Sequence, residues 1–299
     1  MNILITGADG QLGKCILTVY RDVYYQNSKN IYHFVGRESV DITNKDSIEK
    51  WVKDYNIDII INCAAYTNVE KAEDDKDAAM AINFHAVKNL VDVCKKYDVF
   101  LIHISTDFVF DGQTNKPYST ISECKPINVY GLSKYFGENS VLEYDKGMVI
   151  RTSWLYSEFG NNFYRTMLNR IINKQKTRVV CDQVGSPTYA RDLAEFIIFL
   201  IEEQDEEDME AHTGIYHFTN NGCCSWYDFA AAIEFLWQEG VKKDVYIEPC
   251  RASEYPCKAQ RPYYSVLTKY ELLEFPYEPR HWLTALKECM MNDIEIQEH

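Results

Sequence analysis

A tyrosine and a lysine stand four residues apart in the segment Tyr130-Gly131-Leu132-Ser133-Lys134. Side chains at positions i and i+4 lie on one face of a helix. A lysine charge at that distance can stabilise a tyrosine that gives or takes a proton near neutral pH, well below the ordinary phenol pKa of about 10. Because the same spacing occurs on many surface helices, the pair gains weight only from its surroundings.

A glycine-rich loop opens the sequence. Gly7-Ala8-Asp9-Gly10-Gln11-Leu12-Gly13 follows the GxxGxxG pattern, directly after a predicted strand at 2–6 and directly before a predicted helix at 11–20. The glycines permit a tight turn and let backbone N–H groups approach a pyrophosphate at the helix N-terminus. We therefore predict that a dinucleotide cofactor binds to Gly7, Gly10, Gln11, Leu12 and Gly13.

A hydroxyl group completes the candidate catalytic site. Thr106 directly follows the predicted strand at 99–105, and ligands of open α/β sheets bind at the carboxyl ends of strands. When a ketone receives a hydride, Tyr130 can donate the proton, Thr106 can orient the oxygen, and Lys134 can hold the nicotinamide ribose. We predict these three as catalytic residues. The alternatives are that Thr106 caps a turn with Asp107, and that Tyr130 is a packed aromatic beside a solvated Lys134.

Two other reactive side chains are interpreted as structural. His103 alternates with apolar neighbours in a predicted buried strand, which favours a core histidine over a base. Cys63 has no evident histidine partner for nucleophilic chemistry.

The cofactor preference depends on the end of the second predicted strand, Val35-Gly36-Arg37. An acidic residue at this place would bind the ribose hydroxyls of NAD. Here the acid is missing and Arg37 can bind a 2′-phosphate, so we expect NADPH to be preferred and NADH to be tolerated. The alternative is a solvated Arg37, with Glu38 contacting the ribose. Further cofactor contacts are expected from Asp41, Ile42, Ala64, Ala65, Tyr66 and Asn83, although Ala64-Ala65 also suits tight helix–strand packing.

Short apolar strands alternate with amphipathic helices in the first half of the chain. Strands are predicted at 2–6, 31–35, 57–63, 99–105 and 148–153, and helices at 11–20, 45–55, 76–97 and 130–142. The strands are continuous in Ile and Val rather than alternating, as expected when helices cover both faces of a sheet. This pattern predicts an α/β fold with a Rossmann-type, doubly wound parallel sheet.

The second half is less regular. Helices are predicted at 162–173, 189–203 and 226–239, and strands at 178–181 and 215–219, with prolines interrupting the C-terminal segment. We predict an NAD(P)-binding Rossmann domain at 1–154, completed by part of 178–220. Residues 155–299 are expected to form mainly a smaller, partly interleaved α/β lobe for the substrate, with a cleft between the two.

Composition excludes several classes of protein. The net charge of −14 argues against nucleic acid or an anionic membrane as a partner, because both require a basic surface. No run approaches the roughly 18 apolar residues of a membrane span. The start lacks a basic leader, so the ten cysteines are expected to be reduced thiols of a cytoplasmic protein. Because no Cys/His group has zinc spacing, no metal is expected.

Longer motifs carry a family resemblance. They are Asn62-Cys63-Ala64-Ala65-Tyr66-Thr67, Ser105-Thr106-Asp107-Phe108-Val109-Phe110-Asp111-Gly112, Pro126-Ile127-Asn128-Val129-Tyr130-Gly131-Leu132-Ser133-Lys134, Arg151-Thr152-Ser153-Trp154-Leu155-Tyr156, Asp182-Gln183-Val184-Gly185-Ser186-Pro187-Thr188 and Arg261-Pro262. In this order they resemble the extended short-chain dehydrogenase/reductases, and within them the enzymes that reduce dTDP-linked 4-keto sugars. The resemblance extends from the first strand to the last helix.

The resemblance implies reduction of a dTDP-linked 4-keto-6-deoxy sugar to dTDP-L-rhamnose with NAD(P)H. It places Trp154 against the sugar, Val69 and Thr106 at the substrate and Arg261 at the diphosphate. From the residues alone, Trp154 can also be a core residue at the lobe junction. Some members of the family carry glutamates near the first helix in a magnesium-linked dimer interface. Cys15 stands at that place here, which argues against a metal-bridged dimer and leaves a monomer or a homodimer.

Two other functions stay open at this point. One is a related nucleotide-sugar reductase or epimerase. The other is an NADP-binding regulatory subunit similar to the β subunit of methionine adenosyltransferase, which shares the motif Gln260-Arg261-Pro262. The complete set of Thr106, Tyr130, Lys134 and Trp154 favours an enzyme.

Overall fold

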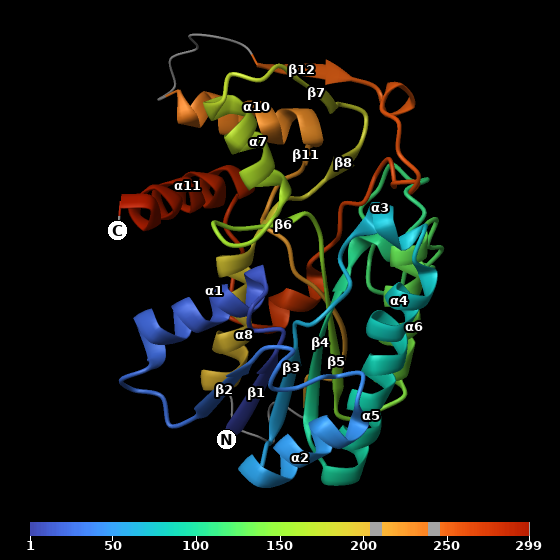
Figure 1. The fold of residues 1–299 in the computed structure, drawn as a ribbon, viewed down its shortest axis with the longest axis vertical. Coiled ribbons are helices and arrows are strands. Elements are labelled where there is room, and N and C mark those ends of the chain that lie inside the picture. Colours follow the sequence, from blue (N-terminus) through green and yellow to red (C-terminus); the bar gives the residue numbers. More distant parts are fainter. Residues whose placement is uncertain (204–210, 239–245, 299) are drawn as a thin grey trace.

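A six-stranded parallel sheet forms the centre of the molecule (Figure 1). The computed structural model describes residues 1–203, 211–238 and 246–298. The strands lie in the order β2-β1-β3-β4-β5-β10, and each neighbouring pair is parallel. Their bounds are β1 Asn2–Thr6, β2 Ile31–Val35, β3 Ile59–Asn62, β4 Phe100–Thr106, β5 Gly147–Thr152 and β10 Gly214–His217. The predicted doubly wound parallel sheet is confirmed.

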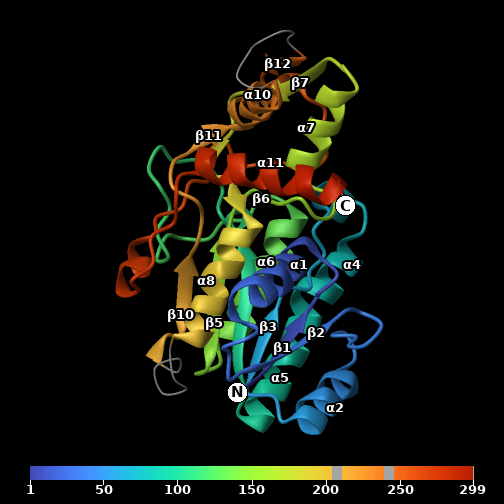
Figure 2. The same cartoon turned by 90° about the vertical axis from the view of Figure 1, so that its left-hand side faces the viewer.

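Helices cover both faces of this sheet (Figures 1 and 2). On one face lie α1 (Gln11–Val19) and α8 (Ala190–Glu202), and on the other lie α2 (Lys45–Tyr55), α5 (Ala86–Tyr97) and α6 (Val129–Leu142). Successive residues of a strand point to opposite faces of the sheet. Ile3 and Ile5 pack in the apolar cluster that contains residues of α1 and α8, and Leu4 packs in the cluster that contains residues of α2 and α5. Burial on both faces explains why the strands are apolar without alternation.

The helix predicted at 76–97 consists of three pieces. It begins as α4 (Lys76–Met80), passes through the π-helical segment η2 (Ala81–His85) and continues as α5. A second π-helical segment, η1 (Tyr20–Tyr24), continues α1. A π-helical segment this short does not visibly change the apolar periodicity of a whole helix, so the sequence pattern did not predict it.

The C-terminal part packs α7 (Phe163–Ile172), α10 (Trp226–Trp237) and α11 (Trp282–Glu298) above the carboxyl ends of the sheet (Figure 1). Three pairs of short strands accompany the helices: β6 (Leu155–Tyr156) with β9 (Thr188–Tyr189), β7 (Thr177–Val180) with β12 (Ile247–Cys250), and β8 (Val184–Gly185) with β11 (Cys224–Ser225). The last residue of the helix predicted at 226–239 lies outside the described residues. Across the ranges that the structure describes, no helix is long and apolar enough to cross a membrane.

The chain returns to the sheet after entering the C-terminal part. Helix α8 packs against α1, and β10 adds the sixth strand beside β5. Thus α8 and β10 belong with the sheet, while 155–189, 218–238 and 246–298 form most of the upper part. The division into a cofactor domain and a substrate lobe stays a prediction about how the two parts work.

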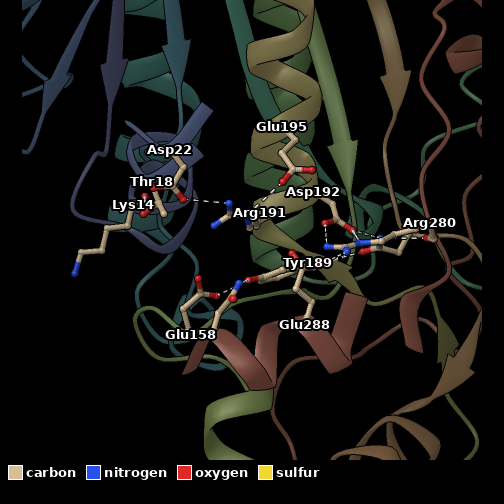
Figure 3. Close-up of polar contacts among 12 residues, drawn as sticks. Lys14, Thr18, Asp22, Glu158, Tyr189, Arg191, Asp192, Glu195, Arg280 and Glu288 are labelled. Carbon is tan, nitrogen blue, oxygen red and sulfur yellow. Dashed lines mark hydrogen bonds and ion pairs between the residues drawn. The ribbon is translucent and has the colours of Figure 1, made fainter. Parts of the chain in front are cut away.

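A partly buried ion pair joins α8 to the start of α11 (Figure 3). Arg280 donates through Nε to Asp192 Oδ2 at 2.9 Å and through NH2 to Asp192 Oδ1 at 2.5 Å. The Asp192 carboxylate is 3% exposed, and Asn220 Nδ2 donates to it at 2.5 Å. Arg280 also pairs with Glu288 on α11. Bidentate arginine–carboxylate pairing is geometrically specific, so this junction helps to fix the upper part on the sheet.

Candidate active site

A cavity of about 920 Å³ lies between the carboxyl ends of the strands and the C-terminal part. It is lined by residues at or just beyond the carboxyl ends of β1, β3, β4 and β5, including Gly7, Ala64, Thr106 and Trp154. This is the edge at which open α/β sheets bind ligands. Fifteen of the predicted site residues line it: Gly7, Gly10, Gln11, Leu12, Arg37, Asp41, Ile42, Ala64, Ala65, Val69, Thr106, Tyr130, Lys134, Trp154 and Arg261.

The glycine loop can hold a diphosphate. Gly7 has φ +67°, and a Cβ there would lie 2.6 Å from the backbone N of Ala64. Gly10 precedes the first turn of α1 without a side-chain cap, and that turn contains no acidic residue. The first N–H groups of the helix therefore face the cavity with the positive end of the helix dipole, an arrangement that favours an anion.

Three predicted cofactor residues do not line the cavity: Gly13, Tyr66 and Asn83. A Cβ on Gly13 would lie 2.5 Å from Ala8 Cα, so this glycine serves the close packing of α1 on the loop. Asn83 accepts from Tyr66 N at 2.8 Å and donates to Tyr66 O at 3.0 Å. Asn83 thereby holds the backbone of the segment after β3 in place, and it does not line the cavity itself.

Asp9 is a cavity residue that escaped the sequence-based prediction. A Cβ on Gly36 would lie 1.9 Å from Asp9 Oδ2, so the Asp9 carboxylate occupies the end of β2 where an acid was sought. Arg37 is exposed and has no ion-pair partner among the described residues. The acid suits a ribose hydroxyl and the arginine suits a 2′-phosphate.

The candidate catalytic residues are placed by two local structures. Thr106 ends β4, donates to Asp107 Oδ1 at 3.1 Å and accepts from Phe108 N at 3.2 Å. The turn-capping alternative for Thr106 is therefore also realised. Tyr130 lies in the first turn of α6, whose N-cap residue Asn128 accepts from Gly131 N at 2.7 Å. A Cβ on Gly131 would lie 2.1 Å from the Phe108 carbonyl oxygen, so glycine at this position lets Tyr130 approach Thr106.

Burial sets the charge of these groups. Burial, aided by the charge of Asp107 and opposed by hydrogen bonding with Thr106, raises the pKa of Tyr130 to about 12. Burial also raises the pKa of Asp107 to about 7, although hydrogen bonds from Ser265 and Thr106 oppose it. At neutral pH the Tyr130 phenol therefore keeps its proton and can donate it.

Lys134 is held by β4. Its Nζ donates to the Ile104 carbonyl oxygen at 2.6 Å and lies 3.2 Å from His103 Nε2. Burial lowers the pKa of Lys134 to about 8, opposed by the charges of Glu138 and Cys63. His103 is fully buried, as expected for a core residue, but it contacts the candidate catalytic lysine.

The upper end of the cavity is aromatic and basic. Trp154, with φ +48°, stacks on Trp226 with ring centroids 3.5 Å apart and planes inclined by 7°. A Cβ on Gly185 would lie 2.5 Å from the Trp154 ring. Trp154 is thus packed at the junction and also lines the cavity. Arg261 donates to Glu70 Oε1 at 2.9 Å, which ties it to α3 (Val69–Ala72).

Sequence reasoning missed Trp226, Arg170 and Arg178 in this part of the cavity. They come from α10, α7 and β7, and no motif surrounds them in the sequence. Arg170, Arg178 and Arg261 bring three guanidinium groups to the cavity, and such groups bind phosphates well. Two of them also pair with glutamates, Arg178 with Glu254 and Arg261 with Glu70. In the part of the chain that the structure describes, no cluster of three or more His, Cys, Asp or Glu side chains suits a metal ion.

The fold and the site together define a Rossmann-type oxidoreductase of the short-chain kind. The chain belongs to the RmlD family, because the family model described as "RmlD substrate binding domain" matches residues 1–294.

Individual relatives agree with this assignment. A dTDP-4-dehydrorhamnose reductase of Aggregatibacter actinomycetemcomitans is 36% identical over 289 residues, 95% of this chain and 97% of the relative. A solved structure of a dTDP-4-dehydrorhamnose reductase from Clostridium acetobutylicum is 37% identical, covers 100% of both chains and superposes with a TM-score of 0.88. That of the Bacillus anthracis reductase in complex with NADP is 35% identical and covers 97% of this chain and 99% of its own, with a TM-score of 0.87.

Proposed function

We propose that this chain uses NADPH to reduce the 4-keto group of dTDP-4-dehydro-6-deoxy-L-mannose (dTDP-6-deoxy-L-lyxo-4-hexulose), which gives dTDP-L-rhamnose. The observation that carries the proposal is one continuous cavity. It joins a diphosphate-binding glycine loop, the group of Thr106, Tyr130 and Lys134, and an upper end with two stacked tryptophans and three arginines. The relatives named as reductases of this sugar support the choice of substrate.

Each residue of the catalytic group has a distinct task. The nicotinamide supplies a hydride to the carbonyl carbon when the cofactor is bound. The Tyr130 phenol, kept protonated by burial, gives its proton to the carbonyl oxygen, and the Thr106 hydroxyl orients that oxygen by hydrogen bonding. Together the hydride and the proton turn the ketone into a secondary alcohol. Lys134 holds the cofactor ribose, and its positive charge favours the phenolate that Tyr130 becomes after donation.

The upper end of the cavity provides the proposed binding site for the nucleotide sugar. Trp154 presents its ring to the sugar, and Val69 adds apolar contact beside it. Arg261, with Arg170 and Arg178, holds the diphosphate. Because Trp226 supports the Trp154 ring by stacking at 3.5 Å, the sugar would meet a pre-positioned aromatic surface.

An NADPH-oxidation assay tests the proposed function. The keto sugar is generated together with its 3,5-epimerase, and the absorbance of NADPH is followed after addition of the purified chain. We expect NADPH consumption that requires the dTDP-linked keto sugar. Binding of NADPH without turnover would support the regulatory-subunit alternative. Tightly bound NAD in the purified chain, with sugar interconversion but no net NADPH use, would support an epimerase.

Replacing Arg37 with alanine is expected to reverse the cofactor preference. A hydrogen bond between charged groups contributes about 1.5–3 kcal/mol, so kcat/KM for NADPH should fall roughly 10- to 100-fold. The value for NADH should stay within a factor of about two, because NADH lacks the 2′-phosphate. Steady-state kinetics with both cofactors measures the change. An unaltered NADPH preference in Arg37→Ala would contradict the role assigned to Arg37.

A further inference from the structure

His103 belongs to a buried chain of polar side chains that ends at the amine of Lys134. Thr6 Oγ1 donates to Asn62 Oδ1 at 2.8 Å, and Asn62 Nδ2 lies 3.0 Å from His103 Nδ1. On its other side, His103 Nε2 lies 3.2 Å from Lys134 Nζ. All four side chains are at most 2% exposed, so each polar atom depends on its partners within the protein.

The backbone fixes the direction of these hydrogen bonds. Ala64 N also approaches Asn62 Oδ1, at 3.2 Å, and a backbone N–H can only donate. Oδ1 is therefore the acceptor end of Asn62, and Nδ2 donates to His103 Nδ1. A neutral imidazole carries one N–H, so its hydrogen must be on Nε2, directed at Lys134 Nζ. An uncharged amine can accept this hydrogen bond, whereas an ammonium group cannot.

We propose that His103 is a positioning residue that presents Nε2–H to Lys134 Nζ and thereby favours the uncharged amine. The consequence for turnover rests on the proposed function. An ammonium at Lys134 would require an acceptor at Nε2, hence a hydrogen on Nδ1 and a rotated Asn62 amide. That rotation would break the contact with Ala64, a residue that lines the cavity. The charge of Lys134 is thus linked to the loop after β3.

The other charged and titratable groups around Lys134 do not remove this effect. Glu138, one turn further along α6, favours the ammonium, but its carboxylate is paired with Arg151. Burial raises the pKa of Cys63 to about 12, so its thiol stays neutral. Tyr130 likewise stays a phenol at neutral pH. The lowered pKa of Lys134, about 8, agrees with an amine whose side-chain hydrogen-bond partner, His103, is a donor.

The sign of the expected pH dependence follows from the role of the ammonium. Lys134 stabilises the Tyr130 phenolate only while it is protonated, so kcat should fall as the pH rises through about 8, the pKa of Lys134. In His103→Gln the amide can turn its oxygen toward Nζ, which favours the ammonium. The pKa of Lys134 should then rise toward its ordinary value, and the alkaline fall of kcat should move to higher pH.

Nuclear magnetic resonance on the chain without substrate or cofactor tests the proposal. The 15N shifts of His103, assigned by their loss in His103→Gln, report the tautomer. The 13Cε shift of Lys134, assigned with Lys134→Arg, reports its titration midpoint. Above pH 8, where Lys134 is mostly an uncharged amine, we expect the Nε2–H tautomer in the wild type. The midpoint of Lys134 should rise by one pH unit or more in His103→Gln. The alkaline limb of kcat should move by a similar amount.

His217→Gln is the matched control. His217 is also fully buried in the same sheet, but it contacts Thr268 O and Arg151 instead of Lys134. Its replacement should leave the midpoint of Lys134 unchanged, even if the protein becomes less stable. An Nδ1–H tautomer above pH 8, or a Lys134 midpoint equal in wild type and His103→Gln, would overturn the proposal. If His103→Gln does not fold, the proposal is tested by the His103 tautomer of the wild type and by the titration midpoint of Lys134 in His103→Asn. A failed reductase assay would leave these measurements valid and refute only the proposed function.

Discussion

Tyr130→Phe is expected to reduce kcat for keto-sugar reduction by about 10²–10⁴-fold, the usual contribution of a positioned general acid. The variant loses only the phenolic O–H, which faces the cavity beside Thr106. The ring can keep its edge-to-face contact with Phe108, whose centroid lies 5.8 Å away. NADPH affinity should therefore change little, and the loss should appear in kcat.

Tyr135→Phe is the control for this experiment. Tyr135 lies on the same helix, but it packs against the apolar cluster of Val109, Phe110, Tyr118 and Leu267. We expect its kcat to stay within about twofold of the wild type. Full activity of Tyr130→Phe, measured as NADPH oxidation with the keto sugar, would contradict the assignment of Tyr130 as the proton donor.

Glu138→Gln is expected to destabilise the protein by about 3–5 kcal/mol, the usual cost of leaving one charge of a buried pair without its partner. Arg151 donates to Glu138 through Nε at 3.0 Å and through NH2 at 2.7 Å. The two side chains are 2% and 0% exposed. The glutamine has the same shape but no charge, so the buried Arg151 guanidinium would lose its charged partner. Neutral groups would remain beside it, among them Cys124 Sγ at 3.2 Å and the face of Phe110 at 5.2 Å.

Urea unfolding followed by tryptophan fluorescence measures this difference. Glu123→Gln provides the same substitution in an exposed pair, in which the side chains of Lys125 and Glu123 are 57% and 74% exposed. That variant should unfold at the same urea concentration as the wild type, because exposed pairs contribute little. Equal stability of Glu138→Gln and the wild type would show that the buried pair is not needed to hold α6 against β5.

The sheet could be predicted from the sequence because its signals are local. Continuous apolar runs locate β1–β5, and the glycine loop marks the step from β1 to α1. Boundaries were less predictable where tertiary packing decides them. The strand predicted at 57–63 is β3 at Ile59–Asn62, and the helix predicted at 76–97 contains the π-helical segment η2.

The site could be predicted only where a motif carries it. Gly7, Thr106, Tyr130 and Trp154 stand in motifs, and all of them line the cavity. Arg170, Arg178 and Trp226 also line the cavity but stand in no motif, because only the fold brings α7, β7 and α10 to one end of it. The contact between His103 and Lys134 was equally hidden, since apolar neighbours made His103 indistinguishable from an inert core residue. Tyr66 and Asn83 lie behind the cavity wall, a distinction that depends on side-chain direction.

Transfer of deuterium from labelled NADPH tests the central claim most directly. NADPH carrying deuterium at C4 of the nicotinamide, prepared separately for each face, is incubated with the chain and the dTDP-linked keto sugar, and the product is examined by nuclear magnetic resonance. The proposed function predicts that one of the two cofactors places deuterium on C4 of the sugar and that the product is dTDP-L-rhamnose. Absence of deuterium from C4 with both cofactors, or a product of the opposite configuration at C4, would contradict it.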